Sequence, residues 1–160
     1  MKRLAIFTIL ILGVLMLGGC QDQKIPSNPN VLFILADDLG YSDLSCMGSD
    51  YYETPNVDRI ADAGMLFADG YAGARVCSPS RATLMTGQFT ATHGITDWIG
   101  AKTGEAWRTK NRKTKLLPPE YEHHMSADDV TLPKAFKAAG YTTFFAGKWH
   151  LGGEGNLPTD

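Results

Sequence analysis

The residues best suited to chemistry are Cys77 and Arg81, in the stretch Cys77-Ser-Pro-Ser-Arg81. A cysteine at a turn into a helix is a candidate nucleophile, because a helix N-terminus favours anionic species and substrates. One helical turn would bring Arg81 back beside residue 77. A thiolate nucleophile would also need a neighbouring base. The plain alternative is a cysteine packed at a helix N-terminus with an arginine on the surface.

Four more polar residues follow predicted strands. Asp37 and Asp38 come directly after an unbroken apolar run, which is typical of a strand buried on both faces. Lys148 and His150 follow a second such segment. Because ligands of open α/β sheets bind at the carboxyl ends of the strands, we expect these residues to share one site. Paired carboxylates suit Ca²⁺ or Mg²⁺, and a solvated Asp-Asp turn is the alternative.

Predicted strands and helices alternate along the chain. The predicted strands are residues 30–36, 65–68 and 141–146. The predicted helices have proline near their starts or glycine at their ends, and they cover residues 54–64, 80–87 and 131–140. Residues 88–127 have weak periodicity and are predicted to be a long loop or insertion. This order predicts an α/β domain with a mostly parallel sheet flanked by helices.

The N-terminus has the pattern of an export signal. Two basic residues precede an apolar run, residues 4–17, which is too short to span a bilayer comfortably. The following Leu-Gly-Gly-Cys20 resembles the bacterial lipobox, in which the cysteine receives a lipid. We therefore expect residues 1–19 to be a lipoprotein signal peptide, Cys20 to be a lipid anchor and residues 20–29 to be a tether. The protein would then lie in the periplasm or at the cell surface, anchored to the bacterial membrane, and ordinary secretion is the alternative.

Composition excludes some functions. The chain has 160 residues, a formal net charge of −2 and 44% hydrophobic residues, which fits about one globular domain. Such a charge does not predict a nucleic-acid surface. The basic run between Lys102 and Lys115 is more typical of a solvated loop than of a surface for sulfated polysaccharide. Cys46 and Cys77 are expected to remain unpaired, and His93 is expected to be structural.

Two stretches resemble the signatures of the formylglycine-dependent sulfatases, members of the alkaline-phosphatase-like superfamily. One is the Cys-Ser-Pro-Ser-Arg stretch, residues 77–81, with the Thr-Gly that follows it; the other is residues 140–150. Asp37 and Asp38 also fit the family. The resemblance implies that residues 30–160 are the N-terminal part of a sulfatase catalytic domain with an alkaline-phosphatase-like fold, incomplete in this chain.

The resemblance also implies a reaction. Cys77 would be oxidised to formylglycine by a formylglycine-generating enzyme, and the aldehyde would hydrate to a gem-diol. One hydroxyl would attack the sulfur of a sulfate ester, and the other would later expel sulfate. This is nucleophilic catalysis through a covalent intermediate.

The resemblance assigns roles to the other candidate residues. Asp37, Asp38 and residue 77 would bind one divalent cation, Ca²⁺ or Mg²⁺. Arg81 would orient the diol, Lys148 would hold sulfate oxygens, and His150 would contact the sulfate or the diol. The family's remaining metal ligands, its acid histidine and a further lysine would lie downstream of this sequence.

The expected substrates are sulfated glycans, because an envelope anchor suits an extracellular polymer. One alternative is a phosphatase or phosphodiesterase of the same superfamily, with a two-metal site and a Thr or Ser nucleophile. The other is a non-catalytic lipoprotein that binds anionic glycans through Arg81, Lys148 and the basic loop.

Overall fold

The computed structural model describes residues 28–110 and 114–159. The chain divides into two compact units, residues 1–36 and 37–160. The described end of the first unit, residues 28–36, has no regular secondary structure, and every helix of the described residues belongs to the second unit. The site residues predicted from the sequence therefore all lie in the second unit, Cys20 excepted.

The predicted signal peptide, residues 1–19, and the predicted lipid anchor Cys20 lie outside the described residues. The predicted tether, residues 20–29, is described only at residues 28 and 29. Within the described residues, every helix is too short or too polar to cross a membrane.

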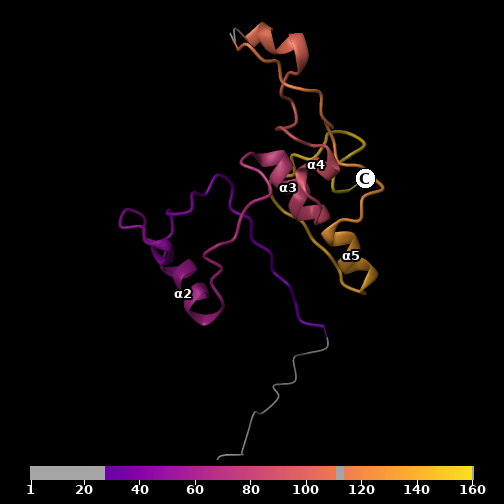
Figure 1. The fold of residues 1–160 in the computed structure, drawn as a ribbon. Coiled ribbons are helices and arrows are strands. Elements are labelled where there is room, and N and C mark those ends of the chain that lie inside the picture. The colour runs from indigo at the N-terminus through magenta and orange to yellow at the C-terminus, as the bar shows by residue number, and fades with distance from the viewer. Residues whose placement is uncertain (1–27, 111–113, 160) are drawn as a thin grey trace, which may run out of the picture. The chain divides into compact units, whose positions relative to one another are not determined.

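Short helices joined by long connections form the second unit (Figure 1). They are η1 (Ser45–Met47), α2 (Pro55–Ala63), α3 (Cys77–Thr86), α4 (Thr90–His93), η2 (Gly104–Lys110) and α5 (Leu132–Ala138). The three predicted helices are thus confirmed as α2, α3 and α5, with bounds that differ by a few residues. The prediction of one long loop over residues 88–127 is wrong in part, because α4 and η2 lie within it.

Local side-chain chemistry explains where these helices begin and end. Pro55 opens α2, and the Thr54 hydroxyl donates to Asp58 Oδ1 at 2.9 Å in the first turn. Asp58 Oδ1 also accepts from the Cys46 N–H at 3.0 Å, which fixes η1 against the start of α2. At the end of α3, Gly87 adopts a φ of 68° and its N–H donates to the Thr83 carbonyl at 2.8 Å.

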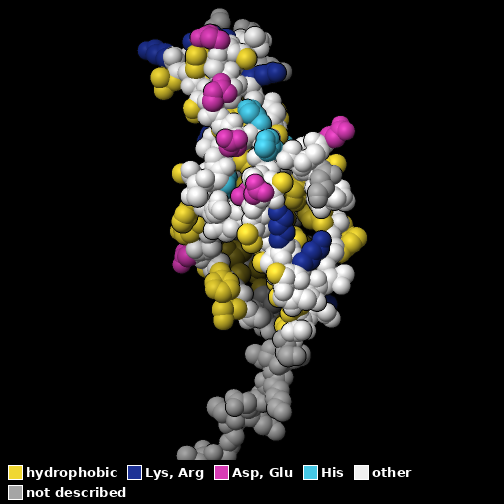
Figure 2. Space-filling view, turned by 90° about the vertical axis from the view of Figure 1, so that its right-hand side faces the viewer, with side chains coloured by type: hydrophobic (Ala, Val, Ile, Leu, Met, Phe, Trp, Pro, Cys, Tyr) yellow, Lys and Arg dark blue, Asp and Glu magenta, His cyan; other side chains and the backbone are white. Residues whose placement is uncertain are grey.

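The predicted sheet is not confirmed, because none of the described residues lies in a strand. Residues 31–36, 65–67 and 141–146 have no regular secondary structure and do not pair in ladders. Their large apolar side chains are exposed: Leu32 is 85% and Phe144 is 93% accessible. A strand of a parallel sheet needs hydrogen-bonded neighbours and helices on both faces, and this part of the chain supplies neither. Figure 2 shows hydrophobic side chains lying among polar ones on the face in view.

A small apolar core lies beneath α3. It consists of Ala82, Ile95, Met125 and Leu151, with Met85, Ile99 and Trp149 packed against it. Both α4 and α5 contact α3. The helix that begins with Cys77 therefore rests on the best-buried part of the molecule, as a helix that positions a reactive group should.

Candidate active site

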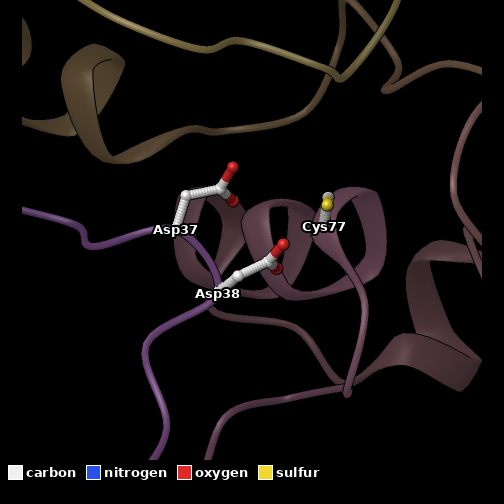
Figure 3. A group of neighbouring side chains, drawn as sticks. All are labelled: Asp37, Asp38 and Cys77. Carbon is white, nitrogen blue, oxygen red and sulfur yellow. The ribbon is translucent and has the colours of Figure 1, made fainter. Parts of the chain in front are cut away.

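Three potential ligand atoms meet at the start of α3. Carboxylate oxygens of Asp37 and Asp38 and the sulfur of Cys77 all lie within 4.8 Å of one another. Figure 3 shows both carboxylates and the sulfur on the same side of α3, with the aspartates on the segment that enters the second unit. Cys77 is free, as is Cys46. Among the described residues this is the only group of three or more such side chains with metal-binding geometry.

Two basic side chains converge on the same cluster. Arg81 Nη2 donates to Asp37 Oδ1 at 3.0 Å, and its Nη1 donates to the Lys148 carbonyl at 2.7 Å. Lys148 Nζ donates to Asp37 Oδ2 at 2.7 Å and to Cys77 Sγ at 3.2 Å. The structure thus brings together residues from the start of the second unit, from α3 and from the segment after residue 146.

These contacts set the charge states of the site. Hydrogen bonds from Lys148, and then from Arg81, hold the pKa of Asp37 below its usual value. Hydrogen bonds to Asp37, and then to Cys77, raise the pKa of Lys148. Asp37 is therefore ionised and Lys148 protonated at neutral pH, and the site keeps both charges of the pair.

The donor set fits a divalent cation in part. Asp37 and Asp38 offer hard carboxylate oxygens. Both oxygens of Asp37 already accept from cations, Oδ1 from Arg81 and Oδ2 from Lys148, so a metal ion would share or displace these contacts. A thiol is a soft ligand, whereas an oxygen at position 77 would suit Ca²⁺ or Mg²⁺ better. Two aspartates supply fewer than the roughly 6–8 oxygens of a complete calcium shell, so further ligands are needed.

His150 lies two residues beyond Lys148 but makes a different contact. Its Nε2 is 3.1 Å from the Ile99 carbonyl, and its Nδ1 is buried without a partner among the described residues. Its backbone φ is 56°, and Asp38 has the same value. Left-handed backbone is costly for residues other than glycine and concentrates at functional sites. Within the described residues, these are the two non-glycine positions that adopt it.

His93 is structural, as expected. Its Nδ1 accepts from the Ile95 N–H at 3.1 Å, so its Nε2 carries the proton and donates to Thr83 Oγ1 at 3.2 Å. Burial lowers its pKa, which keeps the ring neutral. The ring thus ties α4 to α3, with both of its nitrogens in hydrogen bonds.

Two residues near the site were missed from the sequence. Ser78 is fully buried, and its hydroxyl accepts from the Ile99 N–H at 2.9 Å. The place of Ser78 directly after Cys77 was the available signal for it. Nothing in the sequence marked Ile99, because its backbone rather than its side chain makes both contacts.

The chain is similar to a known protein family and to several of its members. The family model described as Sulfatase matches residues 29–156. An N-acetylgalactosamine-6-O-sulfatase of Bacteroides thetaiotaomicron is 35% identical over 158 residues, covering 95% of this chain and 27% of the relative. An N-acetylgalactosamine-6-sulfatase of Sus scrofa is 37% identical, covering 89% and 25%. Arylsulfatase A of Bos taurus is 39% identical, covering 79% and 22%.

The chain spans about a quarter of the length of these curated relatives. The family match nevertheless covers most of the chain and includes the whole cluster from Asp37 to His150. On this evidence, the chain belongs to the sulfatase family.

Proposed function

We propose that the protein hydrolyses sulfate esters, with residue 77 as the source of the nucleophile. The observation that carries this proposal is the convergence of Arg81 and Lys148 on Asp37, directly beside Cys77 Sγ. A sulfate ester is anionic, and further negative charge develops on its oxygens as the ester bond breaks. Fixed cations in a positioned cluster stabilise such charge.

The modification of Cys77 belongs to this proposal. Formylglycine at position 77 would supply a hydrated aldehyde, one hydroxyl of which attacks sulfur while the other later releases sulfate. Arg81, which is 8% exposed and held at two atoms, would fix the orientation of that group. Lys148 has a flexible stem and a half-exposed ammonium, so it would turn from Cys77 towards the sulfate oxygens.

Asp37 and Asp38 would hold a divalent cation, Ca²⁺ or Mg²⁺, together with residue 77. When bound, the cation supplies a Lewis acid that polarises the group at position 77. Both aspartates begin the second unit, so the cation would also fix this segment against the start of α3.

The proposal also includes the fold of the catalytic domain and the location of the protein. Residues 30–160 would be the N-terminal part of an alkaline-phosphatase-like catalytic domain, and the exposed segments 30–36 and 141–146 would be strands of its parallel sheet. Residues 1–19 would direct export to the periplasm or cell surface, with Cys20 lipidated and residues 20–29 as tether. Two of the relatives are named for N-acetylgalactosamine-6-sulfate chemistry, which supports sulfated glycans as substrates here.

The test uses the full-length protein, produced with a formylglycine-generating enzyme. Peptide mass spectrometry is expected to find formylglycine at position 77. Sulfate release from an aryl sulfate and from sulfated glycan oligosaccharides is expected from the wild type and from Cys46→Ala, but not from Cys77→Ala. Cys46 makes a matched control, because it is the other free cysteine of the described residues and lies beside Asp58 rather than in the cluster.

The alternatives give different results. Phosphate esters cleaved faster than sulfate esters, with an unmodified Cys77, would indicate the phosphatase or phosphodiesterase. An unmodified thiol with no ester cleavage, but with glycan binding that needs Arg81 and Lys148, would indicate the binding lipoprotein. Full sulfate release by Cys77→Ala would overturn the proposed mechanism.

A further inference from the structure

The backbone of Ile99 is held from two sides by residues of the site. Its N–H donates to Ser78 Oγ at 2.9 Å, and its carbonyl accepts from His150 Nε2 at 3.1 Å. Ser78 directly follows Cys77 in α3 and is fully buried. A single peptide segment therefore connects the residue after the nucleophile position to His150.

The contact with Ile99 determines the tautomer of His150. A carbonyl oxygen can only accept, so Nε2 must carry a proton whether the ring is neutral or charged. In the neutral ring, Nδ1 is then the unprotonated nitrogen. It is buried and has no partner among the described residues, which leaves it as the ring atom able to accept a proton or a hydrogen bond.

Further contacts restrain the turn that carries Ile99. The Tyr121 hydroxyl donates to the Trp98 carbonyl at 2.7 Å, and the Ala101 N–H donates to the same carbonyl at 3.1 Å. Gly100 has a φ of 107°, and a Cβ there would meet the Trp98 ring at 2.9 Å. The turn is therefore tightly defined, as an element that positions another residue must be.

We infer that Ser78 is a positioning residue: through the backbone of Ile99 it fixes His150 in the Nε2–H form and leaves Nδ1 unprotonated, as the acceptor atom of the ring. The effect on catalysis rests on the proposed function, whereas the tautomer does not. Removing the Ser78 hydroxyl leaves the Ile99 N–H buried without an acceptor, so the peptide must turn or find water. The His150 hydrogen bond goes to the Ile99 carbonyl, which belongs to the next peptide group, so a shift of the Ile99 backbone weakens it.

The test combines spectroscopy and kinetics on the full-length protein. In wild type, ¹⁵N NMR of labelled histidines is expected to show His150 protonated on Nε2. In Ser78→Ala, signals of the Nδ1–H tautomer are expected to appear. The kcat for sulfate release is expected to fall about 10- to 100-fold per formylglycine-containing molecule, with KM changed less than about twofold, as for a misplaced catalytic group.

Three further variants separate positioning from stability and maturation. Ser80→Ala is the matched control, because Ser80 lies in the same motif but its hydroxyl donates to the Ala74 carbonyl. It is expected to keep the His150 tautomer and kcat. Ser78→Thr keeps the hydroxyl and is expected to restore the wild-type spectrum. If Ser78→Ala does not fold, Tyr121→Phe loosens the same turn from its exposed side and is expected to shift the tautomer in the same direction.

The outcomes distinguish the two proposals. An Nδ1–H tautomer in wild type, or an unchanged tautomer and kcat in both Ser78→Ala and Tyr121→Phe, would overturn the positioning role while leaving sulfate hydrolysis intact. The predicted spectra in a protein that cleaves no sulfate ester would support the network and reject the proposed function.

Discussion

Asp37 connects the parts of the site that are most distant in the sequence. One carboxylate oxygen binds Arg81 in α3, and the other binds Lys148, which lies 111 positions further along the chain. The carboxylate is 42% exposed, so water screens both ion pairs and their contribution to stability is small. The arrangement therefore places Lys148 beside Cys77 and holds Arg81 on the same carboxylate, while it adds little to the stability of the fold.

The first prediction concerns the titration of Asp37. Lys148→Met removes the main cause of its lowered pKa, so the pKa is expected to rise towards its usual value. Since the folded pKa is depressed, the associated stability is present above the ordinary value and is lost as pH falls through the lowered one. Carboxyl ¹³C NMR in the presence of a chelator measures this directly. Lys137→Met in α5 serves as control, and an Asp37 pKa that is the same in both variants would contradict the Lys148 hydrogen bond as the main cause of the lowered pKa.

The second prediction concerns Arg81. Arg81→Lys keeps the charge, but one ammonium replaces the planar fork that reaches both Asp37 and the Lys148 carbonyl. Sulfate release in the full-length protein is expected to fall about 100-fold, the typical cost of losing one positioned donor. The rate is measured per formylglycine-containing molecule, because residue 81 lies in the motif that is modified. Arg59→Lys on exposed α2 is the control, and equal rates for the two variants would remove Arg81 from the proposed mechanism.

Most of the site was predictable at the level of residues. The type and order of Asp37, Cys77, Arg81 and Lys148 identified them before their distances were known. The expectation that one helical turn returns Arg81 to residue 77 was less informative, because the guanidinium of Arg81 donates to Asp37 and to the Lys148 carbonyl. Backbone contacts such as those of Ile99 leave no signature in the sequence, since any residue type can make them.

At the scale of elements, α3 depends on a close approach by the segment that precedes it. A Cβ on Gly73 would lie 2.5 Å from both Oγ1 and Cγ2 of Thr83. Thr83 cannot easily move, because its hydroxyl also contacts His93 Nε2. The Thr90 hydroxyl donates to the Gly73 carbonyl at 3.0 Å, which fixes this segment against α4 as well.

The third prediction follows from this approach. Gly73→Ala is expected to lower the free energy of unfolding by about 1–3 kcal/mol, the usual cost of overpacking. Chemical denaturation of the full-length protein measures the change. Gly70→Ala is the control, because the atom nearest its added Cβ, the Phe67 carbonyl oxygen, is 3.6 Å away. Equal stability of the two variants would show that the Gly73 segment can move away at no cost.

Helices were predictable where strands were not, and the reason is physical. The starts of α2 and α5 depend on neighbours within a few residues, such as Pro55 and the Thr131 hydroxyl that accepts from the Lys134 N–H. Residues 30–36 have the composition of a buried strand, but a strand exists only when another one pairs with it. Composition indicates that these residues favour a strand, but it does not supply the second strand with which they would pair.

At the scale of the whole molecule, large apolar side chains remain in contact with water. Leu32, Phe67 and Phe144 are each at least 75% exposed, and all three lie in segments predicted to be strands. Exposed apolar segments with unpaired backbone are sites of association. Within the described residues, the second unit's buried core is small by comparison.

The fourth prediction is that the 160-residue chain, expressed alone, associates through these segments. It is expected to bind a hydrophobic dye and to sediment as more than a monomer. Phe144→Asp is expected to reduce both effects. Leu116→Asp, which changes an 83% exposed residue outside the predicted strands, is the control. A monomer that binds no dye would show that these side chains are covered in solution.

The left-handed backbone at Asp38 and His150 has a consequence for engineering. Aspartate and histidine tolerate this conformation better than most residues, but glycine still adopts it more readily. A laboratory selection for heat resistance alone is thus expected to replace these two residues early, and thereby to erode the reactive centre while the scaffold improves. Screens that seek a hardier variant should therefore assay turnover at every round.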